Sequence, residues 1–397
     1  MRQRAVLHCD MNNYFAAVEE KYRPSLRAIP FAVCGNPEMR HSIVMSKNAL
    51  AKQAGVITGL SFAQARKVCP DLGYVNADYR KYLRETNLAR DIYMKYTDKV
   101  IPYGLDEAWI DLTGNVSSIG EARQIADLIR IEIMYSLGLS ASVGVSDNYI
   151  FSKLASDMQK PNATSVVARE DYERLVWPLP ASDLLFVGRV TAQKLRSIGI
   201  RTIGGIAAST PETLIKLLGK VGGDLWHFAH GDDRSFKPDN QAIKSIGNTI
   251  TPPSDLADNR EASAILYLLT NSVCARLKKH RMKACCISVC MKDTQFNQMI
   301  RQVTLKYPTD NPNMMFNTAY ALLERHFPWE NPLRSVGVRA DNLYTLKWEQ
   351  MSMFRESHQV INVDIDARLK ELTARFGVIN MEKTATSREW TEGAAGS

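Results

Sequence analysis

One short segment limits the folds that this chain of 397 residues can adopt. Tyr103 to Leu112 is an apolar run with two adjacent carboxylates, Asp106 and Glu107, at its centre. A strand with buried flanks does not tolerate charges there, because a buried carboxylate without a partner is strongly destabilising. The pair is compatible with a turn between strands or with a site where cations neutralise it. Asp-Glu pairs are common on solvated turns, so this segment alone leaves both interpretations open.

A further carboxylate follows an apolar segment near the N-terminus. Residues 5–9, Ala-Val-Leu-His-Cys, predict a short buried strand that ends at Asp10. Carboxylates at the ends of two strands can converge on divalent cations, and oxygen-rich sites suit Mg²⁺ or Mn²⁺. Two such cations about 3.5–4 Å apart stabilise the attacking and the leaving oxygen of a phosphoryl transfer. The two segments together favour chemistry of this type.

Three motifs in register carry a resemblance to a known family. They are Asp10 with the aromatic pair Tyr14-Phe15, Tyr-Gly-Leu-Asp-Glu at 103–107, and Lys-Pro-Asn-Ala at 160–163. Their order and spacing resemble the Y-family translesion DNA polymerases over most of the chain. The resemblance implies a low-fidelity, template-directed DNA polymerase that bypasses DNA damage. The implied fold is α+β, a multi-domain right-hand polymerase with palm, fingers, thumb and a C-terminal little-finger domain.

Two departures from the family pattern bear on the subfamily. The family reads Asp-Met-Asp at the first motif, whereas this chain has Asn12 in place of the second Asp. Residues 48–56, Asn-Ala-Leu-Ala-Lys-Gln-Ala-Gly-Val, stand where many members have a Ser-Tyr-Glu-Ala-Arg-type run. Both departures are more similar to the catalytic subunit of bacterial DNA polymerase V than to polymerase IV.

The resemblance implies a role for each residue of the catalytic site. Asp10 and Asp106 would bridge two cations, Mg²⁺ with Mn²⁺ as a substitute, and Glu107 would complete the site that activates the primer 3′-hydroxyl. Met11 would lend only its main-chain carbonyl. Positioning and charge neutralisation would then carry the transfer of a deoxynucleotide from a dNTP to the primer.

The resemblance also implies contacts with the incoming nucleotide by Tyr14, Phe15 and Lys160. Phe15 aligns with the family's steric gate, a ring that excludes a 2′-hydroxyl by clash. Without the alignment, core packing would be the favoured interpretation of this phenylalanine. Lys160 would contact the triphosphate from the palm, although a surface role is the default for a lysine considered alone.

The predicted fingers differ from the family pattern at the phosphate contacts. Ser46 stands where the family often has a threonine hydroxyl, and Lys52 where it has an arginine. Lysine cannot form the planar bidentate fork that arginine gives to phosphate. The family's nearby tyrosine aligns with Ala49. Two expectations remain open, which are weaker nucleotide binding on that side or a substitute contact from Asn48.

Periodicity and turn-forming residues divide the chain into domains. Residues up to 170 alternate short strands with helical patterns, and those from 171 to 235 are helical. Further on, residues 262–279 and 315–326 show helical patterns, and residues 284–291 and 298–307 are candidate strands. In the helical part, Phe186 stands where the family's helix-hairpin-helix usually has a glycine. The expected domains are the palm (1–16 and 76–170), fingers (17–75), thumb with helix-hairpin-helix (171–235), linker (236–243), little finger (244–346) and tail (347–397).

Charge and composition narrow the partners and the compartment. The net charge of +8 and a pI near 9.0 favour a polyanion. Residues 244–346 hold thirteen Lys or Arg against eight Asp or Glu, which suits primer–template DNA. The seven cysteines lack zinc-site spacing and are predicted to be reduced and buried. Neither a long apolar run nor a signal peptide is apparent, which predicts a cytoplasmic protein with no membrane partner.

The tail carries a candidate partner motif, and two rival functions stay open. Gln350-Met-Ser-Met353-Phe354 resembles the peptide that docks bacterial polymerases into the sliding clamp. Recombinase or other accessory subunits are possible partners without a motif of their own. A clamp-associated DNA-binding protein with a degenerate polymerase fold is one rival, although Asp10, Asp106 and Glu107 are retained. A palm-based nucleotide cyclase is the other, although a cyclase needs no basic region after residue 240.

Overall fold

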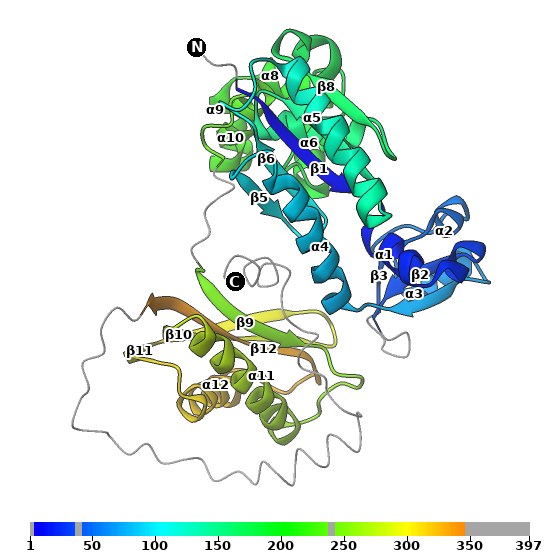
Figure 1. Ribbon diagram of the computed structural model, residues 1–397. Helices are drawn as coiled ribbons and strands as arrows, with labels where there is room; N and C mark the ends of the chain where they lie inside the picture. The colour runs from blue at the N-terminus through cyan, green and yellow to red at the C-terminus, as the bar shows by residue number, and fades with distance from the viewer. Residues whose placement is uncertain (1–3, 36–41, 237–242, 346–397) are drawn as a thin grey trace. The chain divides into compact units, whose positions relative to one another are not determined.

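The computed structural model describes residues 4–35, 42–236 and 243–345 (Figure 1). The chain divides at residue 240 into two compact units, each with its own hydrophobic core. That division falls inside the predicted linker 236–243. The residues of the clamp-like peptide and the rest of the tail lie outside the described residues.

A five-stranded mixed sheet is the centre of the first unit. Its strand order is β5-β6-β1-β7-β8, and β1 runs antiparallel to both of its neighbours. The predicted strand at residues 5–9 is confirmed as β1, which is buried along its whole length. The strands are β1 (Val6–Met11), β5 (Val100–Tyr103), β6 (Glu107–Asp111), β7 (Ala141–Ser146) and β8 (Thr164–Val167).

Helices cover both faces of this sheet (Figure 1). Side chains of a strand point alternately to its two faces, so Leu7 and Cys9 of β1 join the core under α4 (Tyr79–Met94) and α5 (Ile119–Glu132). His8 points the other way and bonds to Ser156 of α6 (Tyr149–Met158). Asp10, two residues further along, therefore lies on the α6 side of the sheet.

Gly144 allows α6 to lie directly against the sheet. It pairs with His8 across β1 and β7. A Cβ built on Gly144 would lie 1.9 Å from the carbonyl oxygen of Ser152 and 2.3 Å from the amide nitrogen of Ser156. No side chain fits in that space. The close approach brings the side chains of α6 near the end of β1 where Asp10 lies.

Replacing Gly144 with alanine is expected to lower the free energy of unfolding by about 3 kcal/mol, because the new methyl meets helix backbone that cannot rotate away. Thermal unfolding of the full chain measures the change. Gly120→Ala is the matched control, since a Cβ there would meet only Ser118 Oγ at 3.7 Å and Gly120 lies within α5. Alanine in a helix is favoured over glycine by roughly 0.5–1 kcal/mol, so the control should be slightly stabilised. Equal melting temperatures for the two variants would contradict the packing argument.

A smaller three-stranded sheet precedes α4. Its order is β3-β2-β4, with β2 antiparallel to β3 and parallel to β4. Its two faces differ, because Ala32 and Cys34 join a small core with α2 and α3, whereas Phe31, Val33 and Val75 belong to the core of the central sheet. The elements are α1 (Tyr14–Tyr22), η1 (Pro24–Ala28), β2 (Phe31–Cys34), β3 (Val44–Lys47), α2 (Ala49–Gln53), α3 (Phe62–Val68) and β4 (Gly73–Asn76).

Short helices form the rest of the first unit, as predicted for residues 171–235. Phe186 adopts φ 70°, the left-handed region that glycine tolerates best. Its ring compensates by packing on Phe228 and Phe236. Gly188 begins α7 without a side-chain cap. The helices are η3 (Arg169–Asp171), η4 (Tyr172–Val176), η5 (Ala181–Asp183), α7 (Arg189–Ser197), α8 (Ile203–Ala207), α9 (Pro211–Leu218) and α10 (Lys220–Ala229).

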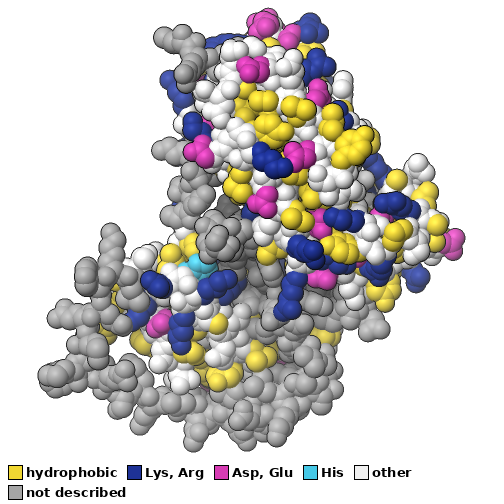
Figure 2. Space-filling model, in the orientation of Figure 1, with side chains coloured by type: hydrophobic (Ala, Val, Ile, Leu, Met, Phe, Trp, Pro, Cys, Tyr) yellow, Lys and Arg dark blue, Asp and Glu magenta, His cyan; other side chains and the backbone are white. Residues whose placement is uncertain are grey.

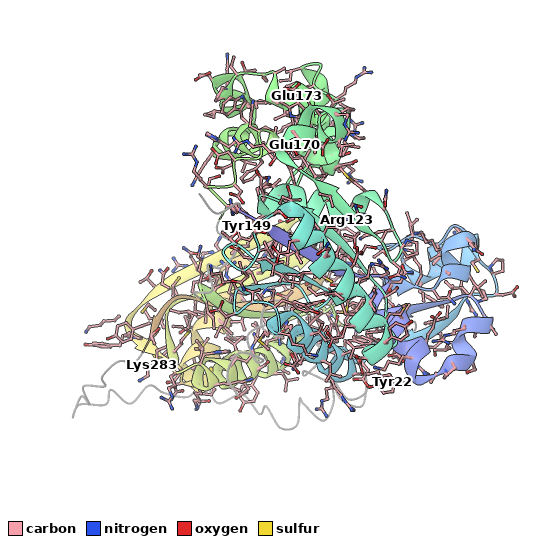
Figure 3. The ribbon with its side chains drawn as sticks, turned by 45° about the horizontal axis from the view of Figure 1, so that its top comes forward. Tyr22, Arg123, Tyr149, Glu170, Glu173 and Lys283 are labelled. Carbon is pink, nitrogen blue, oxygen red and sulfur yellow. The ribbon has the colours of Figure 1, made fainter. Side chains whose placement is uncertain are left out.

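The end of the first unit is tied back to the central sheet. Arg4 binds both carboxylate oxygens of Asp233, at 2.7 and 2.9 Å. Asp233 also accepts the amide of Tyr149 at 2.8 Å, at the start of α6 (Figure 3). The ring of Phe236 packs on Trp109 of β6. The chain therefore leaves this unit from a point fixed on the central sheet.

The second unit is a four-stranded antiparallel sheet with two helices on one face (Figure 1). The buried sides of both helices pack on the sheet in one core. The predicted helices 262–279 and 315–326 and strands 284–291 and 298–307 are all present. The elements are β9 (Ser245–Ile250), α11 (Asn259–Lys279), β10 (Met282–Asp293), β11 (Gln298–Thr309), α12 (Pro312–His326) and β12 (Leu333–Thr345), in the order β11-β10-β12-β9.

Two composition-based expectations can be compared with the structure. All seven cysteines are free thiols, but only five of them are buried, whereas Cys285 and Cys290 are half-buried. The expectation that all would be buried is wrong for these two, because Cys290 alternates with the core residues Val289 and Met291 and Cys285 lies at an irregularity of β10. Among the helices in the described ranges, none is long and apolar enough to cross a membrane.

Candidate active site

The backbone brings the three predicted carboxylates to one end of the central sheet. Asp10 at the end of β1 lies opposite Glu107 at the start of β6. Asp106 occupies the turn between β5 and β6, and its main-chain oxygen accepts the amide of Met11 at 3.0 Å. Gly104 starts the turn with φ 84°. The Asp-Glu pair thus sits where a tight strand connection meets the end of a buried strand.

Two lysines accompany the carboxylates. Lys160 Nζ lies 2.5 Å from Asp10 Oδ2 and 2.7 Å from Asp157 Oδ1. Lys153 of α6 places its Nζ 2.5 Å from Glu107 Oε2. As the side chains stand here, Asp10 and Glu107 are each neutralised by an ammonium group.

Burial and mutual repulsion shift the pKa values of the carboxylates. Burial raises the pKa of Asp10 to about 6 against the opposing effect of Lys160. Burial, and then the charges of Glu107 and Asp10, raise the pKa of Asp106 to about 7. Burial acts the same way on Glu107, but His8 and Lys153 hold its pKa down at about 2. Simultaneous ionisation of all three carboxylates is therefore unfavourable in this arrangement.

The donor set fits divalent cations. Three carboxylates at adjacent strand ends supply the hard oxygen ligands that Mg²⁺ and Mn²⁺ prefer, and a bound cation would offset the burial that raises the pKa values of Asp10 and Asp106. As they stand, no three acidic, His or Cys side chains in the described part of the chain are grouped to hold an ion. Lys160 and Lys153 occupy the carboxylate oxygens of Asp10 and Glu107 instead.

Phe15 lies in an aromatic cluster beside this site. Its ring stacks on Tyr82 of α4 with 4.5 Å between centroids and an interplanar angle of 26°. Tyr79 meets it edge to face at 6.2 Å. The ring is half-buried, so one side is supported by packing while part of it remains accessible. A phenylalanine held in this way can act as a rigid wall.

The nucleotide contact of Tyr14 stays a prediction, and its side chain faces the protein interior. Tyr14 is buried, and its hydroxyl donates to the main-chain oxygen of Tyr82 at 2.6 Å. The same hydroxyl lies 2.9 Å from Thr86 Oγ1. Neighbouring helical residues point about 100° apart, so α1 presents either Tyr14 or Phe15 to the core of the central sheet, and here it presents Tyr14.

The predicted phosphate contacts of the fingers are not brought together. Ser46 is buried, and its hydroxyl donates to the main-chain oxygen of Asn13 at 3.2 Å. It thereby supports the first turn of α1. Lys52 is exposed on α2. Ser46 thus acts on the position of α1, while Lys52 remains a side chain on the surface.

Asn48 offers no substitute contact. Its side chain is buried and caps α2. The amide group uses its oxygen and its nitrogen twice each. Oδ1 accepts the amides of Phe31 and Ala51, and Nδ2 donates to the carbonyls of Leu26 and Ile29. The expectation of a nucleotide contact from Asn48 is therefore wrong, because the residue is saturated by backbone partners.

Sequence reasoning missed two side chains of the site, His8 and Lys153. His8 is fully buried, with Nδ1 2.9 Å from Ser156 Oγ and Nε2 3.4 Å from Glu107 Oε2. Burial lowers its pKa to about 4, so it is neutral at pH 7. The alternation of His8 and Asp10 along β1 was a usable signal, because residues two apart share a face. No comparable signal marked Lys153, which reaches Glu107 only because α6 packs against Gly144.

Comparison with known proteins agrees with this arrangement. The model of the impB/mucB/samB family matches residues 9–157, and the model of that family's C-terminal domain matches residues 243–353. The DNA polymerase IV of Acetivibrio thermocellus is 38% identical, covering 96% of this chain and 97% of the relative. DNA polymerase IV 1 of Bacillus subtilis is 30% identical, covering 98% and 94%.

Solved structures show the same architecture. A Y-family DNA polymerase chimera of Dbh and Dpo4 matches with a TM-score of 0.78 at 24% identity, covering 86% of this chain and 99% of that one. An insertion ternary complex of Dbh DNA polymerase matches with a TM-score of 0.62 at 23% identity and the same coverage. The fold is that of right-hand polymerases with palm, fingers, thumb and little finger.

A right-hand fold with a carboxylate cluster at the end of its palm sheet defines a nucleotide-polymerising enzyme. The chain belongs to the Y-family of DNA polymerases, which carry out translesion synthesis. The relatives named above are polymerase IV enzymes, so the similarity to polymerase V at Asn12 and residues 48–56 is a local one. Family membership also decides against the nucleotide cyclase.

Proposed function

We propose that Asp10, Asp106 and Glu107 hold two divalent cations for nucleotidyl transfer to a primer 3′-hydroxyl. The observation that carries the proposal is that the backbone places three largely buried carboxylates at one end of the central sheet, and that two of them have a raised pKa. Y-family polymerases need divalent metal ions, and Mg²⁺, with Mn²⁺ as a substitute, suits these oxygen donors. When bound, the ions activate the primer hydroxyl and neutralise the charge of the transferring phosphate. Met11 adds its main-chain carbonyl.

The chain's own residues then position the nucleotide. Lys160 lies at the carboxylate cluster, where its ammonium group can turn from Asp10 to the triphosphate. Phe15, supported by Tyr82, is the wall against a ribose 2′-hydroxyl. The distances of Lys160 to Asp10 and of Phe15 to Tyr82 support these roles. Lys52 is exposed on α2 and adds favourable charge there, and Figure 2 shows further Lys and Arg side chains over the α1–α3 part.

Primer–template DNA is the proposed macromolecular partner. Within the described residues 243–345, both helices lie on one face of the sheet, and its outer strand β11 carries exposed Arg301 and Lys306. The compared structure of Dbh DNA polymerase is an insertion ternary complex, which supports binding of DNA and nucleotide here. The domain limits given above, with the little finger at 244–346, belong to this proposal. Binding dominated by phosphate contacts should weaken steeply with salt.

The sliding clamp and accessory subunits remain predictions. The clamp-like peptide with Gln350, Met353 and Phe354 is the only feature that supports the first, and it rests on the sequence alone. A pull-down of the purified clamp with the intact chain and with Phe354→Ala tests it. Recombinase dependence rests on the resemblance, and a cytoplasmic location rests on the sequence alone.

Primer extension with Asp10→Asn tests the proposed site. The variant keeps the size of the side chain but removes the charge, so extension with Mg²⁺ should fall by roughly a thousandfold or more. Binding of primer–template DNA should be unchanged within about twofold, since phosphate contacts by cationic side chains supply most of it. Extension within tenfold of the unmodified protein would overturn the assignment. An unmodified protein that binds DNA without extending it would favour the degenerate-fold rival instead.

A further inference from the structure

The loop that follows α6 and carries Lys160 is held from α5. Arg130, near the end of α5, donates from Nη1 to both the main-chain oxygen and Oδ1 of Asn162, at 3.0 and 2.8 Å. Its Nη2 lies 3.3 Å from Asp127 Oδ1, one helical turn earlier. Asp127 also accepts the hydroxyl of Thr164 at 2.7 Å. The helix α5 therefore holds the chain after α6 through hydrogen bonds at Asn162 and Thr164, both within four residues of Lys160.

The other side of the loop is held by Asn12. The oxygen Oδ1 of Asn12 accepts the amide of Asn162 at 2.9 Å and the hydroxyl of Ser140 at 3.2 Å. Its Nδ2 donates to Ser142 Oγ at 3.0 Å. Asn12 is buried and connects β1, β7 and the loop. The departure from the family motif at this position therefore does not remove a carboxylate from the cluster of Asp10, Asp106 and Glu107.

These hydrogen bonds stabilise an unfavourable backbone conformation at Asn162. Its φ is 53°, in the left-handed region that non-glycine residues adopt rarely, although asparagine tolerates it better than most. Charge-assisted hydrogen bonds such as those from Arg130 are roughly twice as strong as neutral ones. Without them the loop can relax to an ordinary conformation. Lys160, two residues earlier, would then lose its fixed place beside Asp10.

We propose that Arg130, acting with Asn12, is a positioning residue that holds the Lys160 loop in the conformation for binding the nucleotide triphosphate. This inference rests on the proposed role of Lys160. Arg130 itself contacts neither the carboxylates nor Lys160 in any described interaction, and its effect passes through Asn162. Losing it weakens nucleotide binding while the carboxylate site remains assembled.

The test compares Arg130→Met with Arg123→Met in the full-length protein. Methionine keeps an apolar stem and removes the guanidinium. Arg123 lies seven residues earlier on α5 and is exposed (Figure 3), so it controls for loss of charge from the same helix. The readouts are KM for dNTP, kcat, and the Kd of dNTP in a complex with DNA and a dideoxy-terminated primer. Arg130→Met should raise KM and Kd by roughly tenfold, with kcat changed less than about threefold. Arg123→Met should change neither.

A double variant separates this inference from the proposed function. If Arg130 acts through Lys160, Arg130→Met combined with Lys160→Met should bind dNTP no more weakly than Lys160→Met alone. Additive losses of affinity would overturn the inference while leaving the role of Lys160 intact. A normal Kd in Lys160→Met would overturn the proposed role itself. A fall of kcat without a rise of KM or Kd in Arg130→Met would show that the residue supports the carboxylate site rather than the loop.

Discussion

Asp106→Asn is expected to reduce primer extension by roughly a thousandfold or more while making the cation-free protein more stable. The pKa of Asp106 is raised to about 7 by burial and by Glu107 and Asp10. Between pH 4 and 7 the folded protein therefore holds a proton that the unfolded chain has already released. Stability contributed by this group falls as pH rises through that window. Asparagine carries no charge, so the Asp106→Asn variant does not lose this stability as pH rises.

The measurement is thermal unfolding with EDTA across pH 5 to 8. At pH 8 the variant should exceed the unmodified protein by about 1–3 kcal/mol, which is below the full equivalent of the pKa shift because the side chain is partly exposed. The difference should shrink towards pH 5. Adding Mg²⁺ at pH 8 should stabilise the unmodified protein more than the variant. A variant that is inactive but less stable at pH 8 in EDTA would show that Asp106 is structural rather than a ligand held under repulsion.

Phe15→Ala is expected to lower the discrimination between deoxyribonucleotides and ribonucleotides by about 10- to 100-fold. The ring acts by volume, since a phenylalanine offers no hydrogen bond to a 2′-hydroxyl. Its position is held by stacking on Tyr82, so removing the ring leaves an open space beside the sugar. Incorporation of dNTP and of the matching rNTP, each measured as kcat/KM on one primer–template, gives the ratio.

Tyr14→Phe is the control for this experiment. This variant changes the residue next to Phe15 and removes only the Tyr14 hydroxyl, which donates to the main chain of α4. Its loss should lower the free energy of unfolding by about 1 kcal/mol and leave sugar discrimination unchanged. An unchanged ratio in Phe15→Ala, or a shifted ratio in Tyr14→Phe, would show that Phe15 is not the residue that excludes the ribose 2′-hydroxyl.

Much of the site could be predicted from local sequence. A strand ending at Asp10 and a carboxylate pair interrupting an apolar run are readable because burial penalises charge wherever no partner exists. The helices and strands of the second unit followed from periodicity. The surroundings of the Tyr14 and Asn48 side chains could not be predicted, because they depend on long-range partners. Tyr14 found its partners on α4, and Asn48 found carbonyls and amides of the segment 26–31.

The sequence by itself determined the class of protein and singled out three carboxylates as candidate ligands, because both depend on short motifs and on spacing along the chain. Only the tertiary structure decided which of Tyr14 and Phe15 faces the core, since adjacent helical residues compete for one buried side. It also decided that α6 brings Lys153 to Glu107, through the missing side chain at Gly144. Arg130 and Asn12 likewise form hydrogen bonds with Asn162, which is far from both in sequence. Such contacts exist only once the sheet and α5 have packed.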